Sequence, residues 1–383
     1  MRVVVAHNRY ASAQPSGENV IVDAEIAQLR AAGVDVVPFL RSSDEIASYG
    51  PAQKVLLAAS PIRNGRSQRE LTELIERDKP DLLHLHNPYP LLSPWVVRTA
   101  QKHGLKVIQT VHNYRQVCAP GLYFRDGHIC TECRGKAFPL PAIRHTCYRG
   151  SKAQSAIMAT TLTVHRGTWH RVDRYIALTD RIAEHLRDYG IADEHISIKP
   201  NGIPDPGDPA PLGEGFLFAA RLSPEKGLAL LLDAWRRHPE GTLGPLRIAG
   251  DGPLRVLAET AAADRGDITY LGPLSSSGVL TALGRSATVI AASTWHDVLP
   301  TSILEALAAG RPVLATDLGG MPYLVGDAGW IVPPTVDGLA DGLGRAAREA
   351  KGLGDAARQR YLEHFHPDRL TARLVEIYRE VAA

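Results

Sequence analysis

Residues 287–310 read ATVIAASTWHDVLPTSILEALAAG, and the character of the chain changes twice within them. The apolar, β-branched run at 287–293 is typical of a buried strand. A polar loop follows as far as Pro300, and 301–310 then carries apolar residues at helical spacing until Gly310 closes the helix. A buried strand that leads through a short loop into a helix is the repeating unit of an α/β fold.

Similar runs occur on both sides of a Pro- and Gly-rich segment at 203–215, which reads as a linker. They lie at 2–7, 54–58, 81–86, 106–112, 174–179 and 196–202, and then at 215–220, 245–250, 268–272, 287–293, 312–317 and 329–334. Helical patterns such as 20–33 separate several of them, which predicts parallel sheets covered on both faces. We expect two Rossmann-like, doubly wound domains at 1–202 and 203–365, followed by an amphipathic helix at 366–383.

The composition is that of a soluble globular protein, because 44% of the 383 residues are hydrophobic. The 43 basic and 41 acidic residues nearly balance, so we expect no nucleic-acid partner and no general attraction to membranes. The apolar run at the start extends only from Val3 to Ala6, too short for a signal peptide. No apolar stretch reaches the length of about 18 residues that a transmembrane helix needs, and the expected location is the cytoplasm.

Two such domains would face each other across a cleft at the carboxyl ends of their strands, where ligands bind. A dinucleotide would require G-x-G-x-x-G after the first strand, and a P-loop would require G-x-x-x-x-G-K-[ST]; neither is present. GLGDAA at 352–357 fits a looser dinucleotide pattern, but it follows a helical segment. The sequence therefore favours another kind of ligand site.

The segment ARLSPEKG at 220–227 places two cations, Arg221 and Lys226, at a strand-to-helix junction. In a cleft such a pair would clamp a diphosphate, although two solvated surface charges are the alternative. The helix of the opening stretch can be capped by Thr301 or Ser302, and its N-terminal end would favour an anion by about 0.3–1 kcal/mol. The two segments together predict a phosphate site.

Two carboxylates eight residues apart, Asp297 and Glu305, flank this predicted phosphate site. Glu305 lies one turn inside the helix, from which it can accept hydrogen bonds from ribose hydroxyls. Asp297 lies on the loop and can accept a hydrogen bond from a sugar hydroxyl. We expect both acids to bind hydroxyl groups rather than to act as an acid–base pair; an exposed helix charge is the alternative for Glu305.

The chain as a whole resembles the retaining glycosyltransferases of GT-B family 4 over nearly its entire length. The segments that carry the resemblance are SGEN at 16–19, IKPNGI at 198–203, ARLSPEKG at 220–227, IAGDGPL at 248–254 and the segment 295–325. The resemblance implies a GT-B fold, in which the C-terminal helix can cross back to the N-terminal, acceptor-side domain. The chain departs from the family in two places: Asp297 replaces the first Glu of E-x7-E, and Ser16–Gly17 replaces a Gly pair.

The resemblance also assigns roles in donor binding. The counterparts of Arg221 and Lys226 bind donor phosphates, that of Glu305 binds the ribose, and that of Asp297 binds the transferred sugar. A glycine loop near the start, here at Gly17, approaches both donor and acceptor. We expect the donor site to comprise Gly17, Arg221, Lys226, Asp297, Leu299, Pro300, Thr301 and Glu305.

The implied reaction transfers a sugar from a nucleotide diphosphate sugar, such as a UDP-sugar, to an acceptor hydroxyl with retained anomeric configuration. Negative charge grows on the departing diphosphate, so the cations and the helix end would supply catalysis without a cofactor. The counterpart of His112 lies near the reacting sugar. The expected catalytic residues are His112, Arg221, Lys226 and Asp297, and the expected acceptor residues are Glu18, Asn19 and His86.

The acceptor itself stays open among cell-envelope glycans, glycolipids and secondary metabolites. Two other functions fit the same fold: a sugar-nucleotide epimerase, and a non-catalytic protein that binds sugar nucleotides. The epimerase would need no acceptor and would change the sugar of the donor alone.

An insertion at about 115–150 contains all four cysteines, Cys118, Cys130, Cys133 and Cys147, in the spacing C-x11-C-x2-C-x13-C. Four thiolates of this kind are compatible with a structural zinc site, and four reduced cysteines in a packed loop are the alternative. The insertion is also basic, through Arg134, Lys136, Arg144 and Arg149. An anionic or lipid-diphosphate acceptor, with peripheral membrane contact, is therefore compatible with it.

Overall fold

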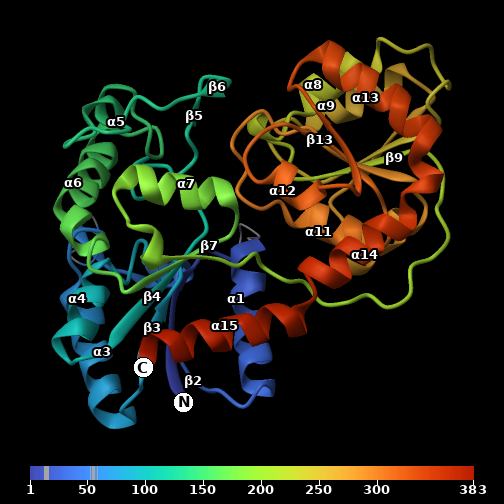
Figure 1. Ribbon diagram of the computed structural model, residues 1–383. Helices are drawn as coiled ribbons and strands as arrows, with labels where there is room; N and C mark the ends of the chain where they lie inside the picture. The colour runs from blue at the N-terminus through green and yellow to red at the C-terminus, as the bar shows by residue number, and fades with distance from the viewer. Residues whose placement is uncertain (13–16, 52, 54–56, 58) are drawn as a thin grey trace. The chain divides into compact units, whose positions relative to one another are not determined.

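The computed structural model describes residues 1–12, 17–51, 53, 57 and 59–383. The chain divides into two compact units (Figure 1). Unit 1 comprises Met1–Tyr123, Cys130–Asn201 and Asp368–Ala383, and unit 2 comprises Phe124–Ile129 and Gly202–Pro367. Each unit contains a parallel sheet with helices packed on it, so the predicted two-domain α/β fold is confirmed.

Within the described residues, the sheet of unit 1 has six strands in the order β2-β1-β3-β4-β7-β8, all parallel. The strands are β1 (Arg2–Arg9), β2 (Asp35–Ser42), β3 (Leu82–Leu85), β4 (Lys106–Val111), β7 (Arg174–Ala177) and β8 (Ile196–Ile198). The helices are α1 (Gly17–Ala31), α3 (Gly65–Asp78), α4 (Trp95–Lys102), α5 (Leu140–Arg144), α6 (Lys152–Trp169), α7 (Asp180–Tyr189) and α15 (Pro367–Ala382). Short 3-10 turns lie at η1 (Ser43–Ser48) and η2 (Asp193–His195).

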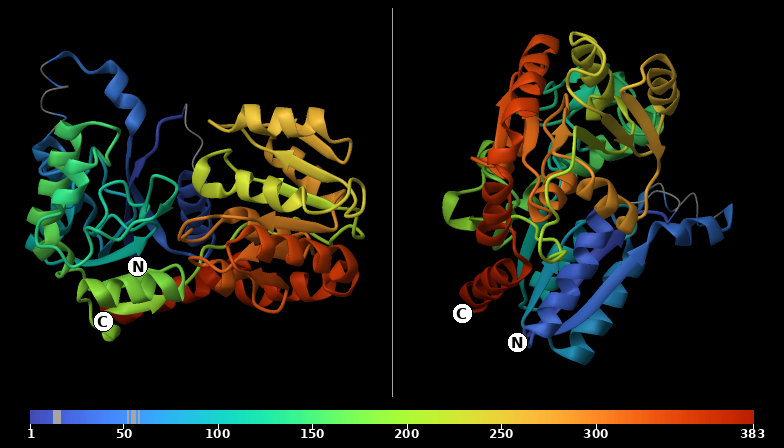
Figure 2. Two further views of the ribbon diagram at one scale, coloured as in Figure 1. Left: turned by 90° about the horizontal axis from the view of Figure 1, so that it is seen from above. Right: turned by 90° about the vertical axis from the view of Figure 1, so that its right-hand side faces the viewer.

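Helices α1 and α15 cover one face of this sheet, and α3 and α4 lie on the other side (Figure 1). Val3 and Val5, on one face of β1, pack in a common core with Leu29 of α1 and with Leu374 and Tyr378 of α15. The last helix therefore completes the core of the unit that holds the first strand, and the two chain ends lie near each other there (Figure 2).

The second strand of unit 1 is not the one that the sequence predicts. Of the strand predicted at 54–58, only residue 57 is described, and it is helical. The strand observed between β1 and β3 in the sequence is β2, which pairs with β1 at the edge of the sheet. It contains Pro38, which cannot donate to a ladder and is tolerated in an edge strand.

The cysteine-containing insertion has secondary structure of its own. A two-stranded antiparallel hairpin, β5 (Phe124–Arg125) and β6 (His128–Ile129), precedes α5 within it. The insertion therefore contains a hairpin and a short helix, which the sequence analysis did not predict.

Within the described residues, the sheet of unit 2 also has six parallel strands, in the order β11-β10-β9-β12-β13-β14. They are β9 (Phe216–Ala219), β10 (Leu246–Ala249), β11 (Ile268–Gly272), β12 (Thr288–Ala291), β13 (Val313–Thr316) and β14 (Gly329–Val332). The helices are α8 (Leu228–Trp235), α9 (Arg255–Asp264), α10 (Ser276–Gly284), α11 (Thr301–Ala308), α12 (Met321–Val325), α13 (Val336–Glu349) and α14 (Gly354–His364), with 3-10 turns η3 (Pro224–Lys226) and η4 (Ala350–Gly352).

Both faces of this second sheet are covered. Phe216 and Phe218 of β9 join one core with α8, α9 and α13, whereas Leu217 between them joins a second core with α10, α11, α12 and α14. This two-sided burial explains why the strands are apolar along their whole length rather than at alternate residues. None of the helices in the described part of the chain has the length and apolarity required to cross a membrane.

The order of strands reverses once in each sheet. In unit 1 the reversal lies between β1 and β3, and in unit 2 it lies between β9 and β12. In open α/β sheets, ligands bind outside the carboxyl ends of the strands at such a reversal. The fold thus indicates one candidate site in each unit.

Candidate active site

In unit 2, the loops that follow β9 and β12 bring two predicted site residues into direct contact. The Lys226 ammonium is 2.5 Å from Oδ2 of Asp297, and the Ser293 hydroxyl donates a hydrogen bond of 3.2 Å to the same oxygen. The ammonium also lies 5.7 Å from the centroid of the Trp295 ring. Asp297 is buried, so the pair places a fixed carboxylate and a cation at the reversal point of the sheet.

Two glycines allow these loops to approach each other. Gly227 has φ of +79°, and a Cβ on it would lie 1.8 Å from the Ala292 carbonyl oxygen. Gly319, in the loop after β13, has φ of +59°, and a Cβ there would lie 2.1 Å from the Asp297 carbonyl oxygen. Any larger residue at either position would push the loops apart, so both glycines are needed for the site geometry.

Arg221, the second predicted cation, is held by an acid that the sequence analysis did not single out. Its guanidinium lies 2.7 Å from Oε1 of Glu225, which also accepts a 2.7 Å hydrogen bond from the Ser223 hydroxyl. Burial alone would raise the pKa of Glu225, but the Ser223 hydroxyl and Arg221 lower it below its usual value. The i, i+4 spacing of Arg221 and Glu225 was the available sequence signal.

Helix α11 begins at Thr301, with Pro300 as its N-cap and without a side-chain cap. The expectation that Thr301 or Ser302 caps the helix is therefore wrong, because both residues lie inside its first turn. Pro300 is buried, and Leu299 and Thr301 are partly buried. Among the described residues no side chain caps the amino end of α11, so the N–H groups of Thr301 and Ser302 stay available to an anion, whereas that of Ile303 donates to the Pro300 carbonyl at 3.1 Å.

Glu305 lies on the second turn of α11 and is partly buried. Burial raises the pKa of its carboxyl to about 7. Glu305 is therefore not the exposed helix charge considered as the alternative, because an exposed carboxyl would keep an ordinary pKa.

In unit 1, imidazoles gather at the reversal between β1 and β3. Nδ1 of His86 lies 2.9 Å from Nε2 of His112, and their rings are stacked at 5.2 Å with 30° between the planes. His7 lies beside them, 3.0 Å from Oδ1 of Asn19, and burial lowers its pKa to about 4. The structure thus brings together His86 and His112, which were predicted separately.

A small pocket with a cavity volume of about 20 Å³, open to solvent, adjoins these histidines. Its lining includes Glu18, His86 and His112. Six lining side chains have a buried polar atom with no hydrogen-bond partner among the described residues: Glu18, His86, Tyr89, Gln109, Arg115 and Trp169. Unsatisfied polar atoms around one pocket fit a ligand rich in hydroxyl groups.

Gly17 and Asn19, two predicted ligand-binding residues, are the sequence neighbours of Glu18, which lines this pocket. Gly17 is exposed at the start of α1, whereas Ser16 falls outside the described residues. Asn19 bonds to His7 and also accepts the Tyr10 backbone N–H at 3.2 Å. Neither Gly17 nor Asn19 lines the pocket, so their predicted ligand contacts stay predictions.

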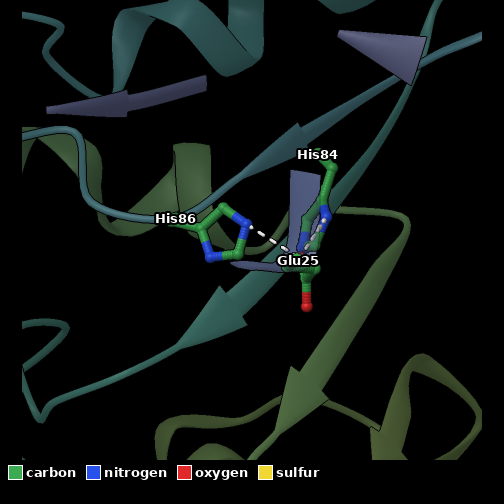
Figure 3. A group of neighbouring side chains, drawn as sticks. All are labelled: Glu25, His84 and His86. Atoms are coloured by element: carbon green, nitrogen blue, oxygen red, sulfur yellow. Dashed lines mark ion pairs between the residues drawn. The ribbon is translucent and has the colours of Figure 1, made fainter. Parts of the chain in front are cut away.

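The four cysteines are all described, and all are present as thiols rather than disulfides. Burial, with the neighbouring thiols, raises the pKa of Cys133 to about 11. Among the described residues, the four cysteines do not form a group of possible metal ligands with their ligand atoms within 4.8 Å of one another. Glu25, His84 and His86 do (Figure 3). The thiols are therefore neighbours without the close approach that a bound zinc ion imposes.

Family comparisons match both halves of the chain. The family described as Glycosyltransferase Family 4 matches residues 15–205, and that described as Glycosyl transferases group 1 matches residues 213–349. The MMP alpha-(1->4)-mannosyltransferase of Mycolicibacterium hassiacum is 28% identical over 219 residues, which are 52% of this chain and 51% of that protein. The chain spans about half or less of the length of the first curated relatives that it matches.

Solved structures match over the full chain. The sucrose-phosphate synthase of Thermosynechococcus elongatus has a TM-score of 0.72 at 18% identity and covers 99% of this chain and 98% of its own. HepE from Anabaena, solved in complex with UDP, has a TM-score of 0.68 at 15% identity, and the match covers 99% of this chain and 100% of HepE. The two sheets and these neighbours define a protein of the GT-B fold.

The two family matches then identify it further, because between them they take in nearly all of both units. The chain belongs to the family 4 glycosyltransferases of the GT-B fold.

Proposed function

We propose that this protein transfers a sugar from a nucleotide diphosphate sugar to an acceptor hydroxyl, with retention of configuration. The observation that carries the proposal is the Lys226–Asp297 pair at the β9/β12 reversal, in which Lys226 ends η3 and Asp297 lies on the loop that leads into α11. A cation and free backbone N–H groups suit a diphosphate, whose negative charge grows as the bond to the sugar breaks. We propose that these groups supply the stabilisation without a catalytic metal.

The proposed roles follow from where each group lies. Lys226, Arg221 and the amino end of α11 bind the diphosphate; Glu305 accepts hydrogen bonds from the ribose. Asp297 holds a hydroxyl of the transferred sugar, and Lys226 keeps its carboxylate oriented until the donor arrives. UDP is the proposed nucleotide, in line with the complex of the neighbour from Anabaena.

The pocket in unit 1 is the proposed acceptor site. Its lining has polar atoms without a hydrogen-bond partner among the described residues, on Glu18, Gln109, Arg115, Tyr89 and Trp169. Such a set of donors and acceptors suits several hydroxyl groups at once. His112 lines the same pocket, which fits its proposed place beside the reacting sugar.

Incubation with UDP-, GDP-, ADP- and TDP-sugars, with and without a panel of hydroxyl acceptors, tests the proposal. We expect one donor to give a transferred sugar of unchanged anomeric configuration only when an acceptor is present. In the same assay, Glu18→Gln should raise the KM of the acceptor and leave that of the donor unchanged. Conversion of the donor sugar without any acceptor would instead indicate the epimerase, and binding without turnover would indicate a sugar-nucleotide-binding protein.

We also propose that Cys118, Cys130, Cys133 and Cys147 close on a structural zinc ion when it is present. The support is their spacing and their proximity within one insertion that has only a two-stranded hairpin and a short helix of its own. Reduced thiols also suit the cytoplasm, the location that we propose. Metal analysis of purified protein should give one zinc per chain, lost in a Cys130→Ser/Cys133→Ser variant; metal-free protein of unchanged thermal stability would contradict this.

A further inference from the structure

In unit 1, a chain of buried side-chain contacts connects Glu25 of α1 through His86 to His112. Glu25 extends one carboxylate oxygen, Oε1, to 3.2 Å from Nε2 of His86. On the other side of that ring, Nδ1 of His86 lies 2.9 Å from Nε2 of His112. Figure 3 shows the imidazoles of His84 and His86 both turned toward the Glu25 carboxylate.

Glu25 and His86 bring an acceptor and a possible donor within hydrogen-bond distance, but the two atoms are not aligned for a hydrogen bond in this structure. Oε1 of Glu25 and Nε2 of His86 are both buried, and neither has a well-aligned hydrogen-bond partner among the described residues. A small rotation of the imidazole would align its N–H with the carboxylate 3.2 Å away and satisfy both atoms.

These three residues could be mistaken for a metal site, but their other partners oppose one. The Lys199 ammonium lies 3.1 Å from Oε2 of Glu25, where it would repel a dication. Both ring nitrogens of His84 are already engaged, Nδ1 with the Tyr378 hydroxyl at 2.6 Å and Nε2 with the Thr110 hydroxyl at 2.8 Å. The Lys199 ammonium and the engaged nitrogens of His84 therefore disfavour a metal ion at this cluster.

The charges of the cluster fix the direction of its hydrogen bonds. Burial would raise the pKa of Glu25, but the Lys199 ammonium and the contact with His86 hold it well below its usual value, so the carboxylate accepts only. The proton between the two residues therefore lies on Nε2 of His86, and in the neutral imidazole Nδ1 is then the acceptor.

We infer that Glu25 and His86 are positioning residues that set the tautomer of His112. His86 donates its Nε2–H to Glu25, which leaves its Nδ1 to accept the Nε2–H of His112. Nδ1 of His112 then carries a lone pair, and it has no partner among the described residues. His112 can thus accept a hydrogen bond from a hydroxyl of the bound sugar or acceptor, and it cannot donate one. This role rests on the proposed function, because it assumes a ligand in the pocket.

The tautomer can be measured on the resting protein. Two-dimensional ¹H–¹⁵N spectra of histidine-labelled protein, with His112 assigned through a His112→Asn variant, distinguish a protonated Nε2 from a protonated Nδ1. We expect protonated Nε2 and bare Nδ1 at His112 in the wild type. A protonated Nδ1, or a doubly protonated ring, would overturn the inference whether or not the protein transfers sugar.

The kinetic consequence has a matched control. The variant Glu25→Gln/Lys199→Met removes both charges together, so it leaves no unpaired ion in the core. It should lower kcat by about tenfold to a hundredfold and leave the KM of the donor unchanged, as for loss of a buried orienting partner. Tyr378→Phe, which is equally buried but contacts only His84 in this cluster, should retain kcat within about twofold.

The conservative replacement Glu25→Asp, which keeps the carboxylate on a shorter side chain, should recover part of the lost kcat. Unchanged kcat in a folded double variant would contradict the positioning role. Equal losses in the double variant and in Tyr378→Phe would also contradict it, because they would indicate a general structural effect. Absence of transfer by the wild-type protein would count against the proposed function, and the spectra would still decide the tautomer.

Discussion

At the scale of single residues, the proposed donor site depends on carboxyl groups whose surroundings differ. Asp297 is buried against a cation and a hydroxyl, so its negative charge is compensated before any ligand binds. The pKa of Glu305 is raised by burial, and among the described residues no cation offsets this effect. The shorter side chain at 297, in place of Glu, is thus fixed by Lys226, whereas Glu305 remains sensitive to protons.

The binding of donor is expected to depend on pH through Glu305. Its pKa of about 7 means that the carboxylate, the form that accepts two ribose hydroxyls, is a minority below neutral pH and predominates above it. The KM for donor should therefore fall as pH rises, by roughly tenfold between about pH 6 and about pH 8. Glu305→Gln cannot titrate, so its KM should be flat over the same range; a wild-type slope that persists in this variant would assign the dependence to another group.

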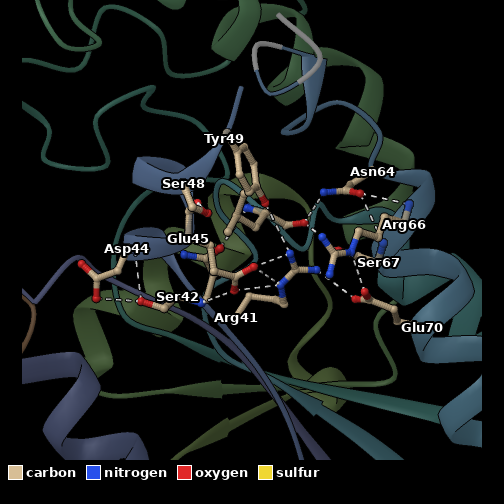
Figure 4. A network of polar contacts seen from close by, with 12 residues as sticks. Arg41, Ser42, Asp44, Glu45, Ser48, Tyr49, Asn64, Arg66, Ser67 and Glu70 are labelled. Carbon is tan, nitrogen blue, oxygen red and sulfur yellow. Dashed lines mark hydrogen bonds and ion pairs between the residues drawn. The ribbon is translucent and has the colours of Figure 1, made fainter. Parts of the chain in front are cut away.

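At the scale of elements, β2 shows what the sequence alone could not reveal. The apolar run at 54–58 looked more like a strand than 35–42, where Pro38 interrupts the pattern. The edge position of β2 removes the cost of that proline. A network of charges then fixes its end, where Arg41 pairs with Glu45 of η1 at 2.5 Å and with Glu70 of α3 at 2.9 Å (Figure 4).

This network gives a prediction for stability. The Arg41 side chain is 7% exposed, and its removal leaves Glu45 without its paired cation and Glu70 with only the exposed Arg66. Arg41→Leu should lower the free energy of unfolding by about 1.5–3 kcal/mol, the range for hydrogen bonds to charged groups. Arg66→Leu is a matched control, because Arg66 contacts the same Glu70 at 2.6 Å but is 59% exposed, and it should cost less than about 1 kcal/mol. Urea denaturation measures both, and equal losses would contradict this explanation.

At the scale of the whole molecule, the sequence predicted the two-domain α/β fold because strands buried on both faces have an unmistakable apolar pattern. The residues of the proposed donor site could also be predicted, since Lys226 and Asp297 lie in motifs beside their strands. The structure adds their direct contact, which joins residues 71 positions apart. The cluster below His112 could not be predicted, because Glu25 meets Lys199 across 174 positions and each alone looks like an ordinary helix or loop charge.

Calorimetric titration with UDP tests the central proposal, that Lys226 and the end of α11 bind the diphosphate of the donor. Wild-type protein should bind UDP more tightly than UMP, and Lys226→Ala should weaken UDP by at least about tenfold, a loss of 1.4 kcal/mol, while changing UMP much less. Arg255→Ala, which removes an exposed cation of unit 2 that pairs with Glu259 on its own helix, should change neither affinity. Equal affinity of wild type and Lys226→Ala for UDP would contradict the proposal.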